Sequence, residues 1–186
     1  VKPAMLAAGS KSATASTPAS APEESRLVWK RIVEPVQPFL EAVSRRLEEQ
    51  VGAFDPEISA YARYALSNQG KQLRPALVAL AANAAGRTTD DHVTVAVVIE
   101  MVHLATLVHD DIMDDALYRR GVPTVNSVEG NSQALLVGDF LLARAGVEAA
   151  HVSADVAMSL AVTISDLCDG QSLEGLFQSR AHRLVD

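Results

Sequence analysis

Residues 100–115 read EMVHLATLVHDDIMDD, an apolar run that ends in a row of carboxylates. Apolar residues recur at helical spacing both before and after Glu100, so the sequence predicts one long helix over residues 90–117. At about 100° per residue, Asp110 and Asp114 lie about 40° apart on one helix face, with about 6 Å of rise between them. His103 falls on the same face, seven residues earlier. This stretch predicts a buried helix with one chemically active face.

Four carboxylates within six residues repel one another and destabilise a helix unless something compensates them. Asp111 points about 100° away from Asp110 and still borders the same region. A hard divalent cation with oxygen ligands, such as Mg²⁺, is the simplest compensator. The plain alternative is a solvated helix end that carries surface acids. The surrounding apolar residues favour the metal site.

The rest of the chain also favours helices. No segment alternates with a period of two between turn signals, whereas apolar residues recur every three or four positions. The sequence therefore predicts an all-α fold. Besides the long helix, the expected helices begin near Pro35–Pro38, Asp55, Leu73, Asn131 and Ser153.

Composition limits the classes of function. A net charge of −7 disfavours nucleic-acid partners, and an aromatic content of 4% leaves few side chains for base stacking. No uninterrupted apolar run approaches the roughly 20 residues of a membrane helix, so no transmembrane segment is expected. The single cysteine, Cys168, fits a reducing compartment and is expected to be buried on a helix. These features predict a cytoplasmic protein.

The first 25 residues are rich in Ala, Ser, Thr and Pro. Such a segment buries too little surface to offset its chain entropy, and residues 1–25 are therefore predicted to be a disordered tail. Residues 26–186 are expected to hold the helical part of the chain.

Basic side chains flank the acidic helix face in the sequence. Lys71 and Arg74 stand three residues apart at the start of a predicted helix, where helix N-termini attract anions. Arg119 and Arg120 follow the acidic row, and their planar guanidinium groups suit bidentate phosphate binding. They could instead pair with the acids beside them. Acids for a cation and separate bases for phosphate together predict a substrate with a diphosphate and an apolar remainder.

Three ordered motifs resemble the trans-isoprenyl diphosphate synthases, the polyprenyl synthetase family. The similarity covers roughly residues 26–176. GKQLRP at 70–75 resembles the family's GKxxRP motif, HLATLVHDDIMDDALYRRG at 103–121 resembles its first aspartate-rich region, and GDFLLA at 138–143 resembles the next block. The resemblance implies an enzyme that elongates an allylic diphosphate with isopentenyl diphosphate. The allylic substrate ionises, its carbocation alkylates the double bond of isopentenyl diphosphate, and a proton is lost.

The resemblance also assigns roles to single residues. It implies that Asp110 and Asp114 bind Mg²⁺, that Asp111 assists, and that Arg119 contacts the allylic diphosphate. It assigns the diphosphate of isopentenyl diphosphate to Lys71, Arg74, His103 and Arg120, and places Gln171 near the substrates. Gln171 could equally be a polar residue at a helix edge. The resemblance implies a homodimer, with a heteromer as the alternative.

Product length is partly encoded in the same helix. The resemblance places Ala105, five positions before Asp110, in the floor of the product tunnel. A small side chain there leaves the tunnel open, and two residues separate Asp111 from Asp114, as in medium- and long-chain enzymes. We therefore expect a product longer than farnesyl diphosphate.

The sequence departs from the family pattern after residue 176. The second aspartate-rich motif and the downstream Lys, Thr and Gln positions are absent. We therefore expect residues 26–186 to be the N-terminal portion of a prenyltransferase domain, a helical bundle around a central cavity that is incomplete at its C-terminus. A partial chain, one component of a split or heteromeric enzyme, and a non-catalytic subunit all fit this pattern.

Two other enzyme classes use similar residues. Terpene cyclases also ionise allylic diphosphates on an aspartate-rich motif, but they have no isopentenyl diphosphate for Lys71, Arg74 and His103 to hold. An HD-type phosphohydrolase would use His109 and Asp110 as metal ligands. The remaining histidines, His92, His151 and His182, lack the partner spacing that such a site needs.

Overall fold

The computed structural model describes residues 23–67 and 70–182, and the side chains of residues 27–67 and 70–176. It divides into two units, residues 1–34 and 35–186. The first unit contains helix α1 (Glu23–Val33). Most of the tail expected over residues 1–25 lies outside the described residues, and α1 begins at Glu23.

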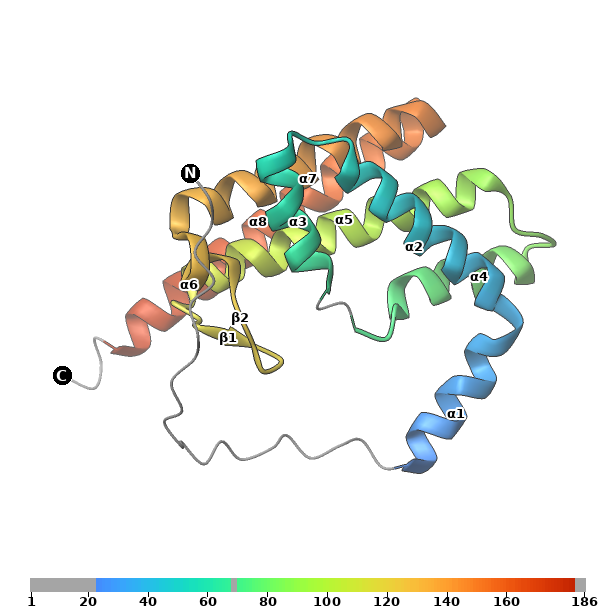
Figure 1. Ribbon diagram of the computed structural model, residues 1–186, viewed down its shortest axis with the longest axis horizontal. Coiled ribbons are helices and arrows are strands. Elements are labelled where there is room, and N and C mark those ends of the chain that lie inside the picture. The colour runs from blue at the N-terminus through green and yellow to red at the C-terminus, as the bar shows by residue number, and fades with distance from the viewer. Residues whose placement is uncertain (1–22, 68–69, 183–186) are drawn as a thin grey trace. The chain divides into compact units, whose positions relative to one another are not determined.

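The second unit is a bundle of helices, which confirms the expected all-α fold (Figure 1). Helix α5 runs through its middle, with α2 and α4 on one side and α7 on another, while α8 packs along α7. A short 3-10 turn, Glu34–Val36, precedes α2. The bundle helices are α2 (Gln37–Gly52), α3 (Pro56–Ser67), α4 (Leu73–Ala84), α5 (Asp90–Met113), α6 (Val125–Glu129), α7 (Asn131–Val152) and α8 (Ala154–His182).

The core lies where α5 meets its neighbours. Small side chains let the helices approach closely, and Ala96, Ala105, Ala134, Ala145 and Ala149 are fully buried. The most extensive helix pair is α5 with α7. Burial of this kind is the main source of stability in a helical bundle.

Gly138 on α7 shows how close the α5–α7 contact is. A Cβ atom at this position would overlap the imidazole ring of His109 on α5. The Nε2 of that ring lies 3.2 Å from the carbonyl oxygen of Leu135 and 3.7 Å from Oδ1 of Asp139. The glycine of the GDFLLA motif therefore makes room for a histidine that precedes the acidic row.

Helix α5 is long and apolar enough to cross a membrane by length and composition alone. Most of the apolar stretch of α5 is buried inside the bundle, and Val97, Met101 and Ala105 are fully buried. Such burial is typical of the central helix of a globular core.

The predicted end of the long helix is wrong by one turn. Helix α5 ends at Met113, and Asp115 has a φ of +50°, which cannot continue a right-handed helix. A short hairpin follows, with β1 (Tyr118–Arg119) paired antiparallel to β2 (Val122–Pro123). Its two loop residues, Arg120 and Gly121, have φ values of +54° and +81°, as a type I′ turn requires. Strands of two residues are too short to produce an alternating pattern in the sequence.

Helix α8 packs on the bundle along one narrow face. Val156, Leu160 and Ile164 are half-buried on this face, whereas Leu167, which continues the same apolar spacing, is 46% exposed. Cys168 is exposed, so its expected burial is wrong. The reason is that α8 packs mainly on α7, which leaves most of its surface uncovered.

Candidate active site

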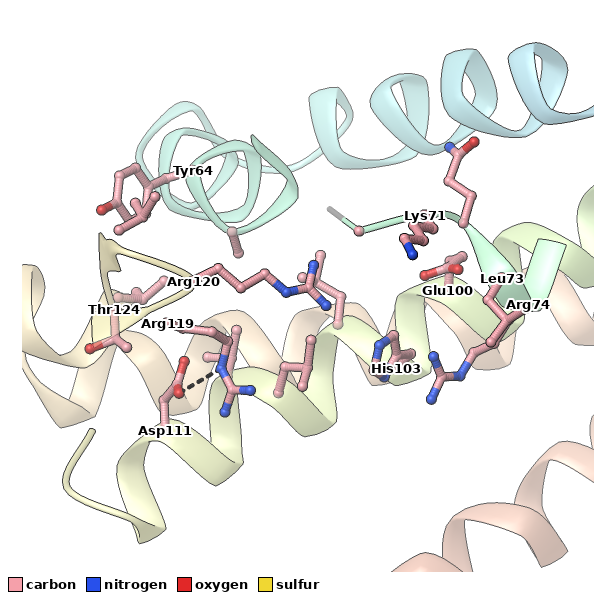
Figure 2. A pocket seen from close by; sticks show the side chains of 18 of the residues that line it. Tyr64, Lys71, Leu73, Arg74, Glu100, His103, Asp111, Arg119, Arg120 and Thr124 are labelled. Carbon is pink, nitrogen blue, oxygen red and sulfur yellow. Dashed lines mark hydrogen bonds and ion pairs between the residues drawn. The ribbon is translucent and has the colours of Figure 1, made fainter. Parts of the chain in front are cut away.

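A cavity of about 560 Å³ lies between the start of α4, the second half of α5 and the β1–β2 hairpin (Figure 2). It brings together five residues that the sequence predicts for substrate binding, together with Asp111. The five are Lys71, Arg74, His103, Arg119 and Arg120. A more open hollow of about 900 Å³ lies between α2 and α3, and none of the predicted site residues lines it.

Arg119 is fixed to the acidic helix by a short ion pair. Its Nε donates a hydrogen bond of 2.8 Å to Oδ1 of Asp111, whose side chain is only 8% exposed. An acid of the same row, Asp111, is thus one partner of Arg119. The pair holds the hairpin against α5 and turns the guanidinium toward the cavity (Figure 2).

Arg120 reaches the opposite wall of the cavity. It extends from the hairpin toward the loop that precedes α4 (Figure 2). A Cβ atom on Gly70 would lie 2.7 Å from one of its terminal nitrogens, so this glycine leaves the space that the guanidinium occupies. The need for glycine in the GKQLRP motif is thus explained by Arg120 of the second motif.

The loop before α4 presents Lys71 to the cavity, and the first turn of α4 presents Arg74. Gln72 adopts a left-handed conformation with a φ of +49°, and its Nε2 donates a 2.6 Å hydrogen bond to Oγ of Ser44 on α2. This contact anchors the loop, so that the side chains on either side of Gln72 line the cavity.

His103 is a neutral side chain among cations. Burial, and then the charges of Arg74, Arg120 and Arg119, lower its pKa from 6.5 to about 4. A neutral imidazole at pH 7 can offer the cavity a hydrogen bond without adding a charge.

Glu100 also lines the cavity (Figure 2). Burial raises the pKa of Glu100, while Arg74 and Arg120 oppose that rise. This carboxylate therefore offsets part of the positive charge in the cavity. Glu100 was not among the residues predicted for the site, although its position three residues before His103, on the same helix face, is a signal that could have identified it.

Asp110 and Asp114 lie close to each other at the end of α5. Burial, and next the charge of Asp114, raise the pKa of Asp110, with further contributions from Asp111 and Glu174; Arg119 opposes them. Such crowding of carboxylates is relieved by a divalent cation, and their oxygens are the ligands that Mg²⁺ prefers. Within the described residues, no three His, Cys, Asp or Glu side chains are gathered as metal ligands. The carboxylate oxygens of Asp110 and Asp114 nevertheless suit Mg²⁺ as ligands.

Four of the predicted residues do not line the cavity. Two of them are Asp110 and Asp114, which lie at the end of α5 beside Asp111. Ala105 is fully buried in α5, and Gln171 is half-buried on α8; neither lines the cavity. Tyr64 and Thr124 do line it, and neither was singled out from the sequence. No motif marks these two positions.

The comparisons with known proteins show the family of this chain. The family model described as Polyprenyl synthetase matches residues 55–184. A prenyl transferase of Cyanophora paradoxa is 37% identical over 151 residues, which cover 79% of this chain and 47% of the relative. The chain belongs to the polyprenyl synthetase family. It spans about half the length of the curated relatives that it matches.

Solved structures with the same fold include two polyprenyl-type synthases. A decaprenyl diphosphate synthase from Rhodobacter capsulatus superposes with a TM-score of 0.74 at 31% identity, covering 78% of this chain and 45% of that one. A polyprenyl synthase from Caulobacter crescentus, solved with calcium and isoprenyl diphosphate, also gives a TM-score of 0.74, at 32% identity. That match covers 78% of this chain and 44% of the other.

Proposed function

We propose that this chain serves a trans-prenyltransferase that condenses isopentenyl diphosphate with an allylic diphosphate and yields a polyprenyl diphosphate. The observation that carries the proposal is a cavity with four cationic side chains beside the acidic end of α5. In the reaction, the allylic C–O bond breaks and diphosphate leaves. A new C–C bond forms to the double bond of isopentenyl diphosphate, and a proton is lost.

The cavity residues divide between the two diphosphates. Lys71, Arg74 and Arg120 would hold isopentenyl diphosphate by charge, and neutral His103 would add a hydrogen bond. Arg119, oriented by Asp111, would contact the allylic diphosphate. Fixed cations stabilise a departing diphosphate without reorganising, which is the main catalytic device available to these residues.

Asp110 and Asp114 would hold Mg²⁺ in this proposal, with Asp111 assisting and Gln171 near the substrates. When bound, Mg²⁺ would neutralise charge on the allylic diphosphate and so make it a better leaving group. The crowding of carboxylates around Asp110 supports this assignment. The calcium in the Caulobacter crescentus structure is consistent with a divalent-cation site in the family.

We further propose a cytoplasmic homodimer. Large apolar side chains are exposed along α7 and α8, including Leu136, Phe140, Met158 and Val162. Exposed apolar side chains in this number favour association. Analytical ultracentrifugation would test the proposal: twice the chain mass is expected, and a monomer at micromolar concentration would contradict it.

Incubation with labelled isopentenyl diphosphate, farnesyl diphosphate and Mg²⁺ tests the proposed reaction. Elongated products are expected. A cyclic hydrocarbon would instead indicate a terpene cyclase, and binding without turnover would indicate a non-catalytic or split-enzyme subunit. Asp110→Asn should abolish the dependence of allylic-diphosphate binding on Mg²⁺. Asp115→Asn is the matched control, because Asp115 is exposed and asparagine tolerates its positive φ.

A further inference from the structure

Tyr64 lies on α3, outside all three family motifs, and yet it lines the cavity. Its ring packs against a small buried cluster formed by Val108, Val125 and Ala134. Its hydroxyl donates a 2.7 Å hydrogen bond to the carbonyl oxygen of Pro123 in β2. The ring is therefore held by apolar contacts, while the polar tip is bound to the hairpin.

The hairpin needs such attachments, because its strands have only two residues each. An isolated hairpin of this size is not stable in water. Arg119 in β1 forms an ion pair with Asp111 on α5. At the end of β2, Thr124 binds the carbonyl oxygen of Ala116 through its Oγ1 at 2.6 Å. The Tyr64 bond adds an attachment to α3, a helix that contributes neither of these partners.

Pro123 stands opposite Tyr118, the neighbour of Arg119. The next ladder bond runs from the Thr124 N–H to the Leu117 carbonyl oxygen, so Tyr118 and Pro123 form a non-hydrogen-bonded pair. The carbonyl oxygen of Pro123 is therefore directed away from β1, where a side chain of another element can bind it. This oxygen is the group that Tyr64 holds. A shift of Pro123 would pass through Tyr118 to Arg119 and through the turn to Arg120, the two guanidinium groups in the cavity.

We propose that Tyr64 is a positioning residue for diphosphate binding: its hydroxyl fixes the β1–β2 hairpin so that Arg119 and Arg120 stand in the cavity. The inference rests on the proposed function, since it assumes that the cavity binds a diphosphate. Tyr64 acts through the arginines and has no direct contact with the substrate in this proposal.

Tyr64→Phe tests the proposal because it removes the hydroxyl and keeps the ring. Isothermal titration of the 186-residue chain with isopentenyl diphosphate, without metal, should show affinity about 3- to 10-fold weaker than wild type, as expected for one lost hydrogen bond. The matched control is Tyr61→Phe, one turn earlier on α3. The Tyr61 hydroxyl interacts with Glu129, and Tyr61 does not line the cavity, so its affinity should stay within about 2-fold of wild type.

A double variant separates positioning from general loss of structure. If Tyr64 acts through Arg120, Tyr64→Phe should weaken binding much less in an Arg120→Ala background than in wild type, because coupled residues are non-additive. Two results would overturn this inference without affecting the proposed function. They are wild-type affinity in Tyr64→Phe, and equal losses of affinity in the wild-type and Arg120→Ala backgrounds. A wild-type chain that binds no isopentenyl diphosphate would overturn the proposed function, and this inference with it.

Discussion

The Nε of Arg119 lies 2.8 Å from Oδ1 of Asp111, and this ion pair joins the hairpin to the acidic face of α5. The ion pair also distinguishes Asp111 from Asp110 and Asp114 in the acidic row. Asp111 is turned inward to an arginine of the cavity, whereas Asp110 and Asp114 are left crowded together at the helix end. We propose that this row of acids has two tasks: Asp111 orients Arg119, and Asp110 and Asp114 offer oxygen ligands to a cation.

Asp111→Asn tests the first of these tasks. The substitution removes the charge of a nearly buried partner, so we expect a loss of about 2 kcal/mol in unfolding free energy and weaker diphosphate binding. Urea denaturation measures the loss. Asp90→Asn is the matched control, because the Arg46–Asp90 pair has the same 2.8 Å distance but Asp90 is 79% exposed. Its loss should stay below about 1 kcal/mol. Equal losses in the two variants would contradict a special role for the buried pair.

Gly138→Ala tests the close approach of α5 and α7. The added methyl group would collide with the His109 ring, and we expect a destabilisation of about 1–3 kcal/mol. Gly146→Ala lies on the same helix with no atom within 4 Å of its added Cβ. It should be neutral or stabilising by up to about 1 kcal/mol, since alanine favours helices. Chemical denaturation compares them, and a tolerated Gly138→Ala would show that the helices can separate freely.

His103 predicts a pH dependence of stability. Its pKa is about 4 in the folded chain against 6.5 for the unperturbed group, so the unfolded chain binds more protons between these values. Stability should therefore fall as the pH drops from 6.5 towards 4. His103→Gln cannot titrate and should lose less stability over this window. Thermal melts at several pH values measure the difference, and parallel profiles for both proteins would contradict the lowered pKa.

Residue patterns predicted the helices well and the connections poorly. The long apolar run around Met101 specified α5, because a helix buried on most sides must be apolar on most sides. The hairpin was not predicted because strands of two residues have no periodicity. The burial of α8 was predicted incorrectly because apolar residues at helical spacing do not reveal how much of a helix is covered by its neighbours. Cys168 illustrates the second case.

The sequence motifs contain most of the residues that line the cavity, but not Glu100 or Tyr64. Lys71 and Arg120 belong to motifs far apart in the sequence, and the structure brings both to one cavity. Glu100 and Tyr64 belong to none of the motifs. Their roles depend on what lies near them in space, the charges of Arg74 and Arg120 for Glu100 and a proline carbonyl for Tyr64.

Ala105→Phe tests the expectation of a product longer than farnesyl diphosphate. Ala105 is fully buried, so the larger ring should cost about 1–3 kcal/mol of stability as well as shortening the product. Ala105→Leu is a milder variant that should shift the products less. Chromatography of labelled products measures the distribution. An unchanged distribution from a folded, active variant would show that this position does not limit chain length.

Titration with isopentenyl diphosphate tests the central claim most directly, namely that the basic cavity binds a diphosphate. The wild-type chain should bind with one site. Lys71→Ala should weaken binding at least 10-fold, as expected when a charged partner of about 1.5–3 kcal/mol is removed. Arg87→Ala removes an exposed cation beyond α4 that does not line the cavity, and should leave the affinity unchanged. Equal weakening by the two substitutions, or no binding to the wild-type chain, would contradict the account.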